Sequence, residues 1–141
     1  MGESETLFGQ EHVKRYVETD GEQGHDWLRG SSTLILTTKG RRSGEQRSTP
    51  LIYANHGDDY LVVASKGGSD EPPDWYRNLQ ENPAVQVQVK GDRFTARARD
   101  ATPEEKPEMW KTMTEQWPDY DEYQKQTDRE IPIIRLRPIA Q

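Results

Sequence analysis

Six short segments of this 141-residue chain have the patterns of β-strands, and most links between them are too short for parallel crossovers. A parallel neighbour requires a connection of a dozen or more residues, usually a helix. Turn residues such as Gly57-Asp58 and Gly91-Asp92 instead join consecutive segments directly. The chain is therefore predicted to form an antiparallel sheet from strands at residues 33–38, 48–55, 60–65, 84–90, 94–101 and 131–137.

The individual strands differ in their expected surroundings. Residues 33–38 (TLILTT) are largely apolar and β-branched, whereas residues 84–90 (AVQVQVK) alternate, which is typical of a strand with one solvated face. Pro50 lies in the second segment, and because proline has no N–H to donate, an edge strand or a bulge is expected there. The first three segments are expected to pair as an antiparallel meander, since their links are short.

Four segments have helical patterns, and together with the strands they define the fold class. Val13, Tyr16 and Val17 recur at helical spacing, and Thr102 followed by Pro103 is a good helix start. We predict a mainly β fold with helices (α+β): a single antiparallel barrel of about six strands with helices packed outside. Residues 1–30 are expected to be a short helix and linker, and residues 31–141 the barrel domain. The helices are predicted at residues 10–18, 74–81, 102–116 and 119–127.

Composition excludes several classes of function. The chain has no cysteine, so thiol nucleophiles, iron–sulfur ligation and disulfides are excluded. His12, His25 and His56 lack the spacing of metal ligands, and no metal site is expected. No apolar stretch approaches the ~20 residues that span a bilayer. Residues 1–22 lack the apolar centre of a signal peptide, so a cytoplasmic protein without stable membrane insertion is expected.

The net charge of −6 is unevenly distributed. Residues 100–130 are strongly acidic, whereas residues 30–47 contain Lys39, Arg41, Arg42 and Arg47 against a single acid. An acidic protein with one basic loop lacks the extended positive face of a nucleic-acid-binding protein. Guanidinium groups beside two glycines and Ser43 indicate instead a local anion site, the alternative being a solvated turn.

Three further clusters combine polar, glycine and aromatic residues. The sequence Ala64-Ser65-Lys66-Gly67-Gly68 follows the third strand and is suited to holding a ring or a phosphate, although it is not a P-loop. Residues 74–79 place Trp75 and Leu79 on one helical face. Residues 117–123 contain Trp117, Tyr120 and Tyr123. Taken singly, these clusters are better explained by a flexible turn or by packing against the barrel.

In one order and at consistent spacing, however, the clusters resemble the deazaflavin-dependent nitroreductase family, a branch of the split β-barrel flavoproteins. The similarity covers residues 33–138, about three quarters of the chain. The matching residues are 36–44 (LTTKGRRSG), Arg47, Pro50-Leu51, 64–68 (ASKGG), Trp75-Tyr76, Asn78-Leu79, Asn82-Pro83, 99–101 (RDA), Tyr120, Tyr123, 127–129 (TDR) and Ile131-Pro132.

This resemblance implies a split β-barrel that binds coenzyme F420, an 8-hydroxy-5-deazaflavin with a phosphodiester and an oligoglutamate tail. The basic loop would hold the phosphate and the tail carboxylates, the strand residues would line the ring, and residues 74–78 would close over it. Arg77 is expected to offset the acids near this site. The implied cofactor-binding residues are Arg41, Arg42, Ser43, Arg47, Ser48, Thr49, Pro50, Leu51, Ile52, Val63, Ala64, Ser65, Lys66, Asp74, Trp75, Tyr76, Arg77 and Asn78.

The resemblance also implies a reaction. Family members transfer a hydride from the reduced deazaflavin to an organic acceptor, and the cofactor supplies the reactivity while the protein supplies position and charge. Tyr120, Ser65 and Tyr123 are the expected catalytic residues, because a donor near the acceptor stabilises the charge that the hydride brings. The acceptor is expected to be a small or medium-sized molecule: a quinone, a nitroaromatic or an activated alkene.

Three alternatives remain at this point. An FMN-binding split-barrel reductase or oxidase is the nearest, although FMN has no glutamate tail to match so many cations in one loop. A deazaflavin carrier without turnover is the second. Nucleic-acid binding by the basic loop is the third, and the surrounding negative field opposes it. The sequence does not indicate an oligomeric state.

Overall fold

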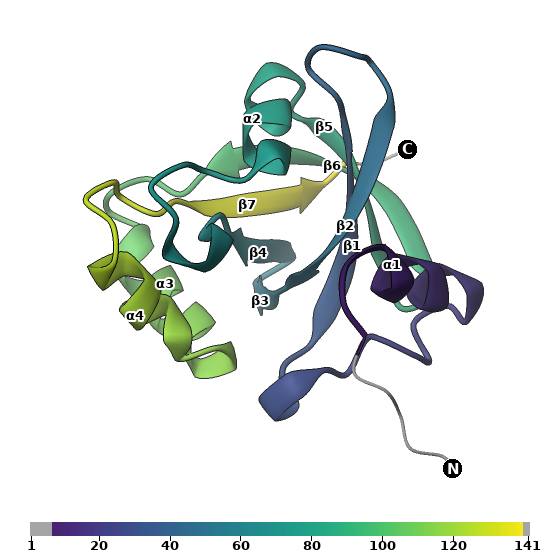
Figure 1. The fold of residues 1–141 in the computed structure, drawn as a ribbon, viewed down its shortest axis with the longest axis horizontal. Coiled ribbons are helices and arrows are strands. Elements are labelled where there is room, and N and C mark those ends of the chain that lie inside the picture. The colour runs from purple at the N-terminus through teal and green to yellow at the C-terminus, as the bar shows by residue number, and fades with distance from the viewer. Residues whose placement is uncertain (1–6, 140–141) are drawn as a thin grey trace.

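The computed structural model describes residues 7–139. Within these residues it is an antiparallel sheet of seven strands with four flanking α-helices (Figure 1). The strands are β1 (Thr33–Lys39), β2 (Gln46–Ile52), β3 (Ala54–His56), β4 (Asp59–Val63), β5 (Ala84–Val89), β6 (Asp92–Asp100) and β7 (Ile133–Pro138). The helices are α1 (Gly9–Glu18), α2 (Asp74–Glu81), α3 (Lys106–Gln116) and α4 (Asp119–Lys125), with short 3-10 turns η1 (Leu28–Gly30) and η2 (Lys66–Gly68).

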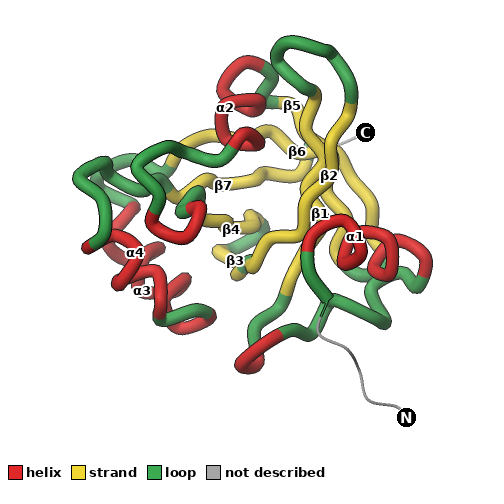
Figure 2. The backbone as a smooth tube through the Cα atoms, viewed as in Figure 1, coloured by secondary structure: helices red, strands yellow, loops and turns green. Residues whose placement is uncertain are grey.

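The sheet order β2-β1-β5-β6-β7-β4-β3 makes the fold a split barrel. Strands β2 and β3 are separated in sequence by Tyr53 alone, yet they form the two opposite edges of the sheet. The sheet must therefore curl until its edges approach each other, and Figure 2 shows the strands curling in this way. The predicted α+β class and the antiparallel split barrel are confirmed.

Both antiparallel pairings of the predicted meander occur, but the strand expected at residues 48–55 is two strands at opposite edges of the sheet, so the three segments do not lie side by side. The first part of that strand, β2, pairs with β1, and the second part, β3, pairs with β4. Pro50 lies opposite Ile35 on β2, which is an edge strand, one of the two positions predicted for it. On an edge strand a residue without an N–H can be accommodated without loss of a ladder hydrogen bond. The chain leaves the first edge at Tyr53, whose buried hydroxyl lies 2.9 Å from Nε2 of His25.

The face that α1 buries differs from the predicted one. Tyr16 is buried as expected, but Val17 is 40% exposed and His12 is buried in its place. The Tyr16 hydroxyl donates to the carbonyl of Thr33 and accepts from the N–H of Lys90, so its burial leaves no polar atom unpaired. Segment 7–30 is therefore bonded directly to the sheet.

The boundaries of the predicted helices and of the last strand need small corrections. Helix α3 begins at Lys106, four residues later than predicted, because residues 102–105 form a turn. In that turn the N–H of Glu105 donates to Oγ1 of Thr102, and the N–H of Thr102 donates to the Glu105 carboxylate, the reciprocal pattern of a capping box. Helix α4 ends at Lys125, two residues early, and β7 begins at Ile133 instead of residue 131.

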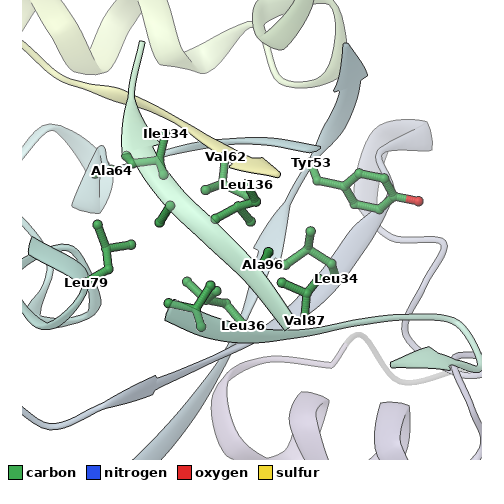
Figure 3. Packing of buried hydrophobic residues seen from close by; sticks show 12 residues of the cluster. Leu34, Leu36, Tyr53, Val62, Ala64, Leu79, Val87, Ala96, Ile134 and Leu136 are labelled. Carbon is green, nitrogen blue, oxygen red and sulfur yellow. The ribbon is translucent and has the colours of Figure 1, made fainter. Parts of the chain in front are cut away.

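The main core fills the inside of the curled sheet. Alternate residues of β1, β5 and β7 point inward, and Figure 3 shows Leu34, Leu36, Val87 and Ile134 converging there. Leu79 of α2 closes one end of this core and is 2% exposed. A second cluster packs α3 and α4 against β4 and β7. The two clusters fix the β2 edge, the end of β4, and α4 relative to one another, and these elements line the site described below.

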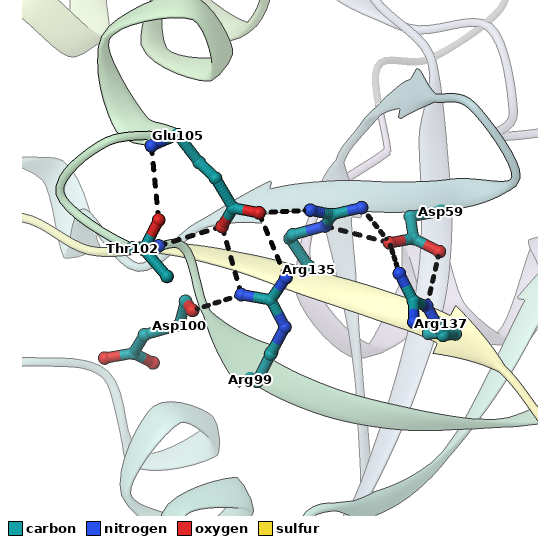
Figure 4. Close-up of polar contacts among 7 residues, drawn as sticks. All are labelled: Asp59, Arg99, Asp100, Thr102, Glu105, Arg135 and Arg137. Atoms are coloured by element: carbon teal, nitrogen blue, oxygen red, sulfur yellow. Dashed lines mark hydrogen bonds and ion pairs between the residues drawn. The ribbon is translucent and has the colours of Figure 1, made fainter.

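A network of charged side chains ties β4, β6, β7 and the start of α3 together (Figure 4). Asp59 is 4% exposed and accepts hydrogen bonds from Arg135 and Arg137. Arg135 also pairs with Glu105, which in turn pairs with Arg99. Each buried charge therefore has a partner of opposite sign, as burial requires.

Candidate functional site

A cavity of about 470 Å³ lies between the β2 edge, the turn after β4, the N-terminal segment and the α3–α4 region. This volume is within the range of small-molecule sites. Ten of the residues that the sequence placed in the site line it: Thr49, Pro50, Leu51, Ile52, Val63, Ser65, Lys66, Trp75, Tyr120 and Tyr123. Eight further residues complete the lining: Phe8, Gly9, His12, Trp27, Thr33, Gly67, Pro73 and Trp117.

The turn after β4 has an unusual backbone. Ser65 is in the right-handed helical region, whereas Lys66, Gly67 and Gly68 follow with φ values of 46°, 63° and 88°. Successive N–H groups in such a conformation form a concave nest that attracts anions. Among the described residues no acceptor contacts the N–H of Lys66 or Gly67, and the space beside Gly67 is open. The turn therefore presents free donors at the cavity.

Arg129 holds this turn from behind. Its Nε donates to the carbonyl of Ser69 at 2.8 Å, and its Nη2 donates to the carbonyls of Ser65 at 2.9 Å and Ala64 at 3.2 Å. A single planar guanidinium thus fixes both ends of the turn, a task that its fork geometry suits. Sequence similarity included Arg129 but assigned it no role.

Two buried hydroxyl groups at the cavity, those of Tyr120 and Ser65, have no partner within residues 7–139. Tyr120 and Ser65 are 5% and 8% exposed, and no described donor or acceptor bonds to either hydroxyl. Burial, and secondly the neighbouring Tyr123, raise the pKa of Tyr120 well above its usual range. Tyr120 therefore keeps its proton and can donate a hydrogen bond to a ligand. Tyr123 differs, since its oxygen accepts a bond from Nε1 of Trp117 at 3.3 Å.

One side of the cavity is an aromatic wall, defined here as Phe8, His12, Trp27, Trp117, Tyr120 and Tyr123. Half of it comes from the N-terminal segment, which the sequence analysis placed outside the site. The signal available was the presence of bulky aromatic residues in an otherwise polar segment. Local sequence does not indicate that these residues line the same cavity as Trp117. Burial lowers the pKa of His12, although bonds to backbone carbonyls of Gly24 and residue 7 oppose this, so its imidazole is neutral.

The basic loop lies at the end of the β1–β2 hairpin, beyond the cavity lining (Figure 1). Arg41 is held by α2: its Nη1 donates to Oδ1 of Asn78 at 2.9 Å, and its Nη2 lies 3.6 Å from the Asp74 carboxylate. By contrast, no carboxylate among residues 7–139 lies within 4.0 Å of the charged groups of Arg42 or Arg47. The hairpin therefore presents Arg42 and Arg47 without a counter-ion among the described residues.

Several other predicted residues have roles away from the cavity. Tyr76 donates to Asp100 at 2.7 Å on another face of α2, and Arg77 pairs with Glu71, which supports the expected offsetting of acids. Asn78 is 4% exposed and joins the hairpin to α2. The remaining members are Ser43, whose Oγ accepts the N–H of Glu45; Ser48, whose Oγ bonds Thr37; and Ala64, which is fully buried.

Other kinds of site receive no support from the described part of the chain. Residues 7–139 contain no cluster of three His, Asp or Glu side chains arranged to hold a metal ion. None of the described helices combines the length and apolar character needed to cross a bilayer.

The described residues fit a cofactor with a flat ring and an anionic tail. The lining strands supply apolar side chains, the nest supplies free N–H groups, and Lys66, Arg42 and Arg47 supply positive charge without internal partners. Among the described residues that line the cavity, Lys66 is also the single charged one. The positive charge is thus confined to one end of the site.

Comparison with known proteins gives the same answer. The sequence profile of the F420H2-dependent quinone reductases matches residues 8–138. An F420H2-dependent quinone reductase of Mycobacterium tuberculosis strain H37Rv is 38% identical over 128 residues, which cover 89% of this chain and 86% of that protein.

Two solved structures are also similar. An F420H2-dependent reductase shares 39% identity with a TM-score of 0.69, and the match covers 74% of this chain and 93% of that one. A structure described as a domain-swapped dimer shares 37% identity with a TM-score of 0.73, covering 91% and 96%. The expected kinship with deazaflavin-dependent reductases is confirmed, and this chain belongs to the F420H2-dependent quinone reductase family.

Proposed function

We propose that this protein passes a hydride from reduced F420 to a quinone bound in the cavity. The observation that carries the proposal is the juxtaposition of an apolar cavity, a nest of free backbone donors and a hairpin with uncompensated arginines. A flat ring joined to a polyanionic tail satisfies all three features at once. When bound, reduced F420 supplies the hydride from the ring carbon that replaces N5 of a flavin.

The chain's own residues divide into three groups around such a ligand. The β2 residues 49–52 and Val63 contact the ring, while the N–H groups of Lys66 and Gly67 receive the phosphate. Arg42 and Arg47 bind tail carboxylates. Arg41 adds positive charge to this tail site, and its ion pair with Asp74 holds it against α2. Trp75 covers the ring from α2, while Asn78 and Asp74 act by holding the hairpin in place.

Tyr120 and Ser65 act on the acceptor. Addition of a hydride to a quinone leaves negative charge on an oxygen, and a nearby hydrogen-bond donor stabilises that charge. The Tyr120 hydroxyl has no partner within the described residues, and its raised pKa keeps the proton in place. Tyr120 is therefore a hydrogen-bond donor, and Tyr123 positions the α4 side of the cavity through Trp117.

The direct test is a pair of fluorescence titrations with F420 and FMN. We expect F420 to bind and FMN to bind at least tenfold more weakly, because FMN lacks the tail that Arg42 and Arg47 would bind. The double variant Arg42→Ala/Arg47→Ala should weaken F420 binding, and the loss should be larger at low ionic strength since exposed charges are screened by salt. Arg97→Ala is the matched control, because Arg97 is exposed on β6 and lies outside the site. Equal affinity for FMN and F420 would contradict the proposal.

Turnover with reduced F420 tests the acceptor side and separates an enzyme from a carrier. We expect Tyr120→Phe to lower kcat for a quinone about ten- to a hundredfold, the effect of losing one donor in a site partly shielded from water. The Kd for F420 should change less than twofold. A Tyr120→Phe variant with wild-type kcat, or one that loses F420 binding, would remove Tyr120 from this role. The expected absence of nucleic-acid binding and the cytoplasmic location stay predictions.

A further inference from the structure

A second cavity, of about 330 Å³, is lined by Arg129 and shares no lining residue with the first. It lies between the segment before α2, the end of β6, the start of α3 and the segment before β7. Its volume also falls within the range of small-molecule sites. The apolar part of its lining consists of Pro72, Ala101, Pro132 and Ile133.

Arg129 has one guanidinium nitrogen that makes no bond within the described part of the chain. Its Nε and Nη2 donate to the carbonyls of Ser69, Ala64 and Ser65, which leaves Nη1 without an acceptor. No buried side-chain nitrogen of the described residues lacks a partner, so Nη1 is open to solvent. No carboxylate in residues 7–139 lies within 4.0 Å of this guanidinium. Because Arg129 lines the second cavity and not the first, its free donor is available to a ligand there.

A side chain of opposite charge lines the same cavity. The Asp100 carboxylate accepts hydrogen bonds from the Tyr76 hydroxyl at 2.7 Å and from Nε2 of Gln80 at 3.3 Å. Figure 4 shows it directed away from the network of charged side chains around Glu105. Among the described residues, no Lys, Arg or His nitrogen lies within 4.0 Å of this carboxylate. Asp100 and Arg129 therefore face one cavity with opposite charges that do not pair with each other.

The other two charges of this lining already pair, since Nζ of Lys106 lies 3.0 Å from the Glu130 carboxylate. The described lining thus carries two positive and two negative side chains. A simple anion would be repelled by the two carboxylates, and a simple cation by Arg129 and Lys106. A molecule that carries a carboxylate and an ammonium group close together finds a partner of opposite charge at both ends.

We propose that the second cavity is an effector site for a small zwitterion with an apolar body, the chemistry of a free aliphatic α-amino acid. The ligand carboxylate accepts from Nη1 of Arg129, its ammonium group pairs with Asp100, and its apolar part packs against the apolar lining. The same guanidinium clamps the turn after β4. Binding of the effector and of the cofactor therefore strengthen each other by the same factor. This coupling, unlike the site itself, rests on the proposed function.

The test of the site needs no cofactor. The probes share one branched carbon skeleton: L-leucine carries both charges, 4-methylpentanoate only the carboxylate and 3-methylbutylamine only the ammonium group. Titrations of the full chain are followed by amide NMR spectra. Leucine should saturate the protein with a Kd of about 1–10 mM, because so small a ligand makes few contacts. It should shift the amide signals of Asp100, Ala101, Arg129 and Glu130. The two single-charge probes should bind about three- to fivefold more weakly, the range for one partly exposed charge pair.

A charge-removing variant separates recognition from structure. Asp100→Asn keeps an acceptor for the Tyr76 hydroxyl but loses the negative charge. It should weaken leucine binding about three- to fivefold and leave the Kd for 4-methylpentanoate no higher than in wild type, whereas a structural disturbance would weaken both. Asp92→Asn is the matched control, because Asp92 is an exposed carboxylate on the same strand that lines neither cavity.

Fluorescence titrations with F420 then test the coupling. Saturating leucine should lower the Kd for F420 about fivefold in wild type and in Asp92→Asn, the lower end of the usual range for coupled sites. No saturation by leucine up to about 100 mM, or equal affinity for the three probes, would overturn the site. Leucine binding that leaves the Kd for F420 unchanged would overturn its role as an effector. If F420 itself fails to bind while the preference for leucine depends on Asp100, the site stands and the proposed function falls.

Discussion

Arg129 offers the sharpest test of how the protein prepares its cofactor site. Its guanidinium donates three hydrogen bonds, to the carbonyls of Ala64, Ser65 and Ser69, and so fixes a turn in which three successive residues have positive φ. Lys66 is the member of that series that pays a steric cost for this conformation, because it has a Cβ. In Arg129→Ala the turn loses its clamp, and the free N–H groups of the nest lose their fixed direction.

The expected magnitude follows from these three bonds. Hydrogen bonds with a charged donor contribute about 1.5–3 kcal/mol each when buried. Arg129 is half-buried and water replaces part of the loss, so we expect a net cost of about 2 kcal/mol in the free energy of unfolding. For a chain of this length that corresponds to a fall in Tm of about 7 °C. If reordering the loosened turn on cofactor binding costs about 1.4 kcal/mol of binding free energy, the Kd for F420 rises about tenfold.

Thermal melts and F420 titrations on the same variants provide the assay. Arg129→Lys keeps the charge but replaces a planar fork with a point charge, so its Tm and Kd should lie between those of wild type and Arg129→Ala. Arg97→Ala should match wild type in both measurements, since Arg97 is exposed and makes no side-chain bond to another described residue. A lowered Tm with an unchanged Kd would refute the reasoning, because Arg129 would then stabilise the fold without preparing the site.

Two further predictions concern stability. Burial raises the pKa of Asp59, but the hydrogen bonds and charges of its arginine partners outweigh this and hold the pKa below its usual value. The stabilisation is thus present above about pH 4 and is lost as pH falls through the folded-state pKa. Asp59→Asn should cost about 2–3 kcal/mol in urea denaturation at pH 7, and this difference should shrink steadily as pH is lowered below about 4. A pH-independent difference would contradict this. Gly68→Ala should cost about 2 kcal/mol and weaken F420 binding, because φ is +88° and a Cβ would lie 2.9 Å from the carbonyl oxygen of Tyr123. Gly57→Ala has a similarly positive φ of +61° but open space around it, so it should cost about 1 kcal/mol, and an equal loss in both variants would exclude the steric explanation.

Local sequence patterns predicted most of the secondary structure. The alternation in residues 84–90 corresponds to β5, and the turn expected at Gly91-Asp92 lies one residue earlier, at Lys90-Gly91, since Val89 pairs with Asp92. Pro50 indicated an edge strand because a missing N–H has the same consequence in any sheet. The basic loop was visible because charge is a property of composition and needs no fold to be counted.

The split at Tyr53 was not visible in sequence. Residues 48–55 are predicted as one strand because every residue is compatible with extended backbone. The division arises because β2 and β3 pair with different strands, at opposite edges of the sheet. Similarly, Tyr16 and His12 displace Val17 from the interior because the barrel provides partners for their polar atoms.

The sequence by itself determined the antiparallel class, the hairpins, the glycine turn after β4 and the cationic loop, all of which depend on neighbours a few residues apart. The tertiary structure alone decided that residues 8, 27 and 117 form one wall, that Arg129 supports the turn at residues 65–69, and that Tyr76 faces away from the cavity. The physical reason is that strands distant in sequence, such as β4 and β7, must pair before the sheet can curl. That curl, and no local preference, brings the edges and their aromatic residues around a common space.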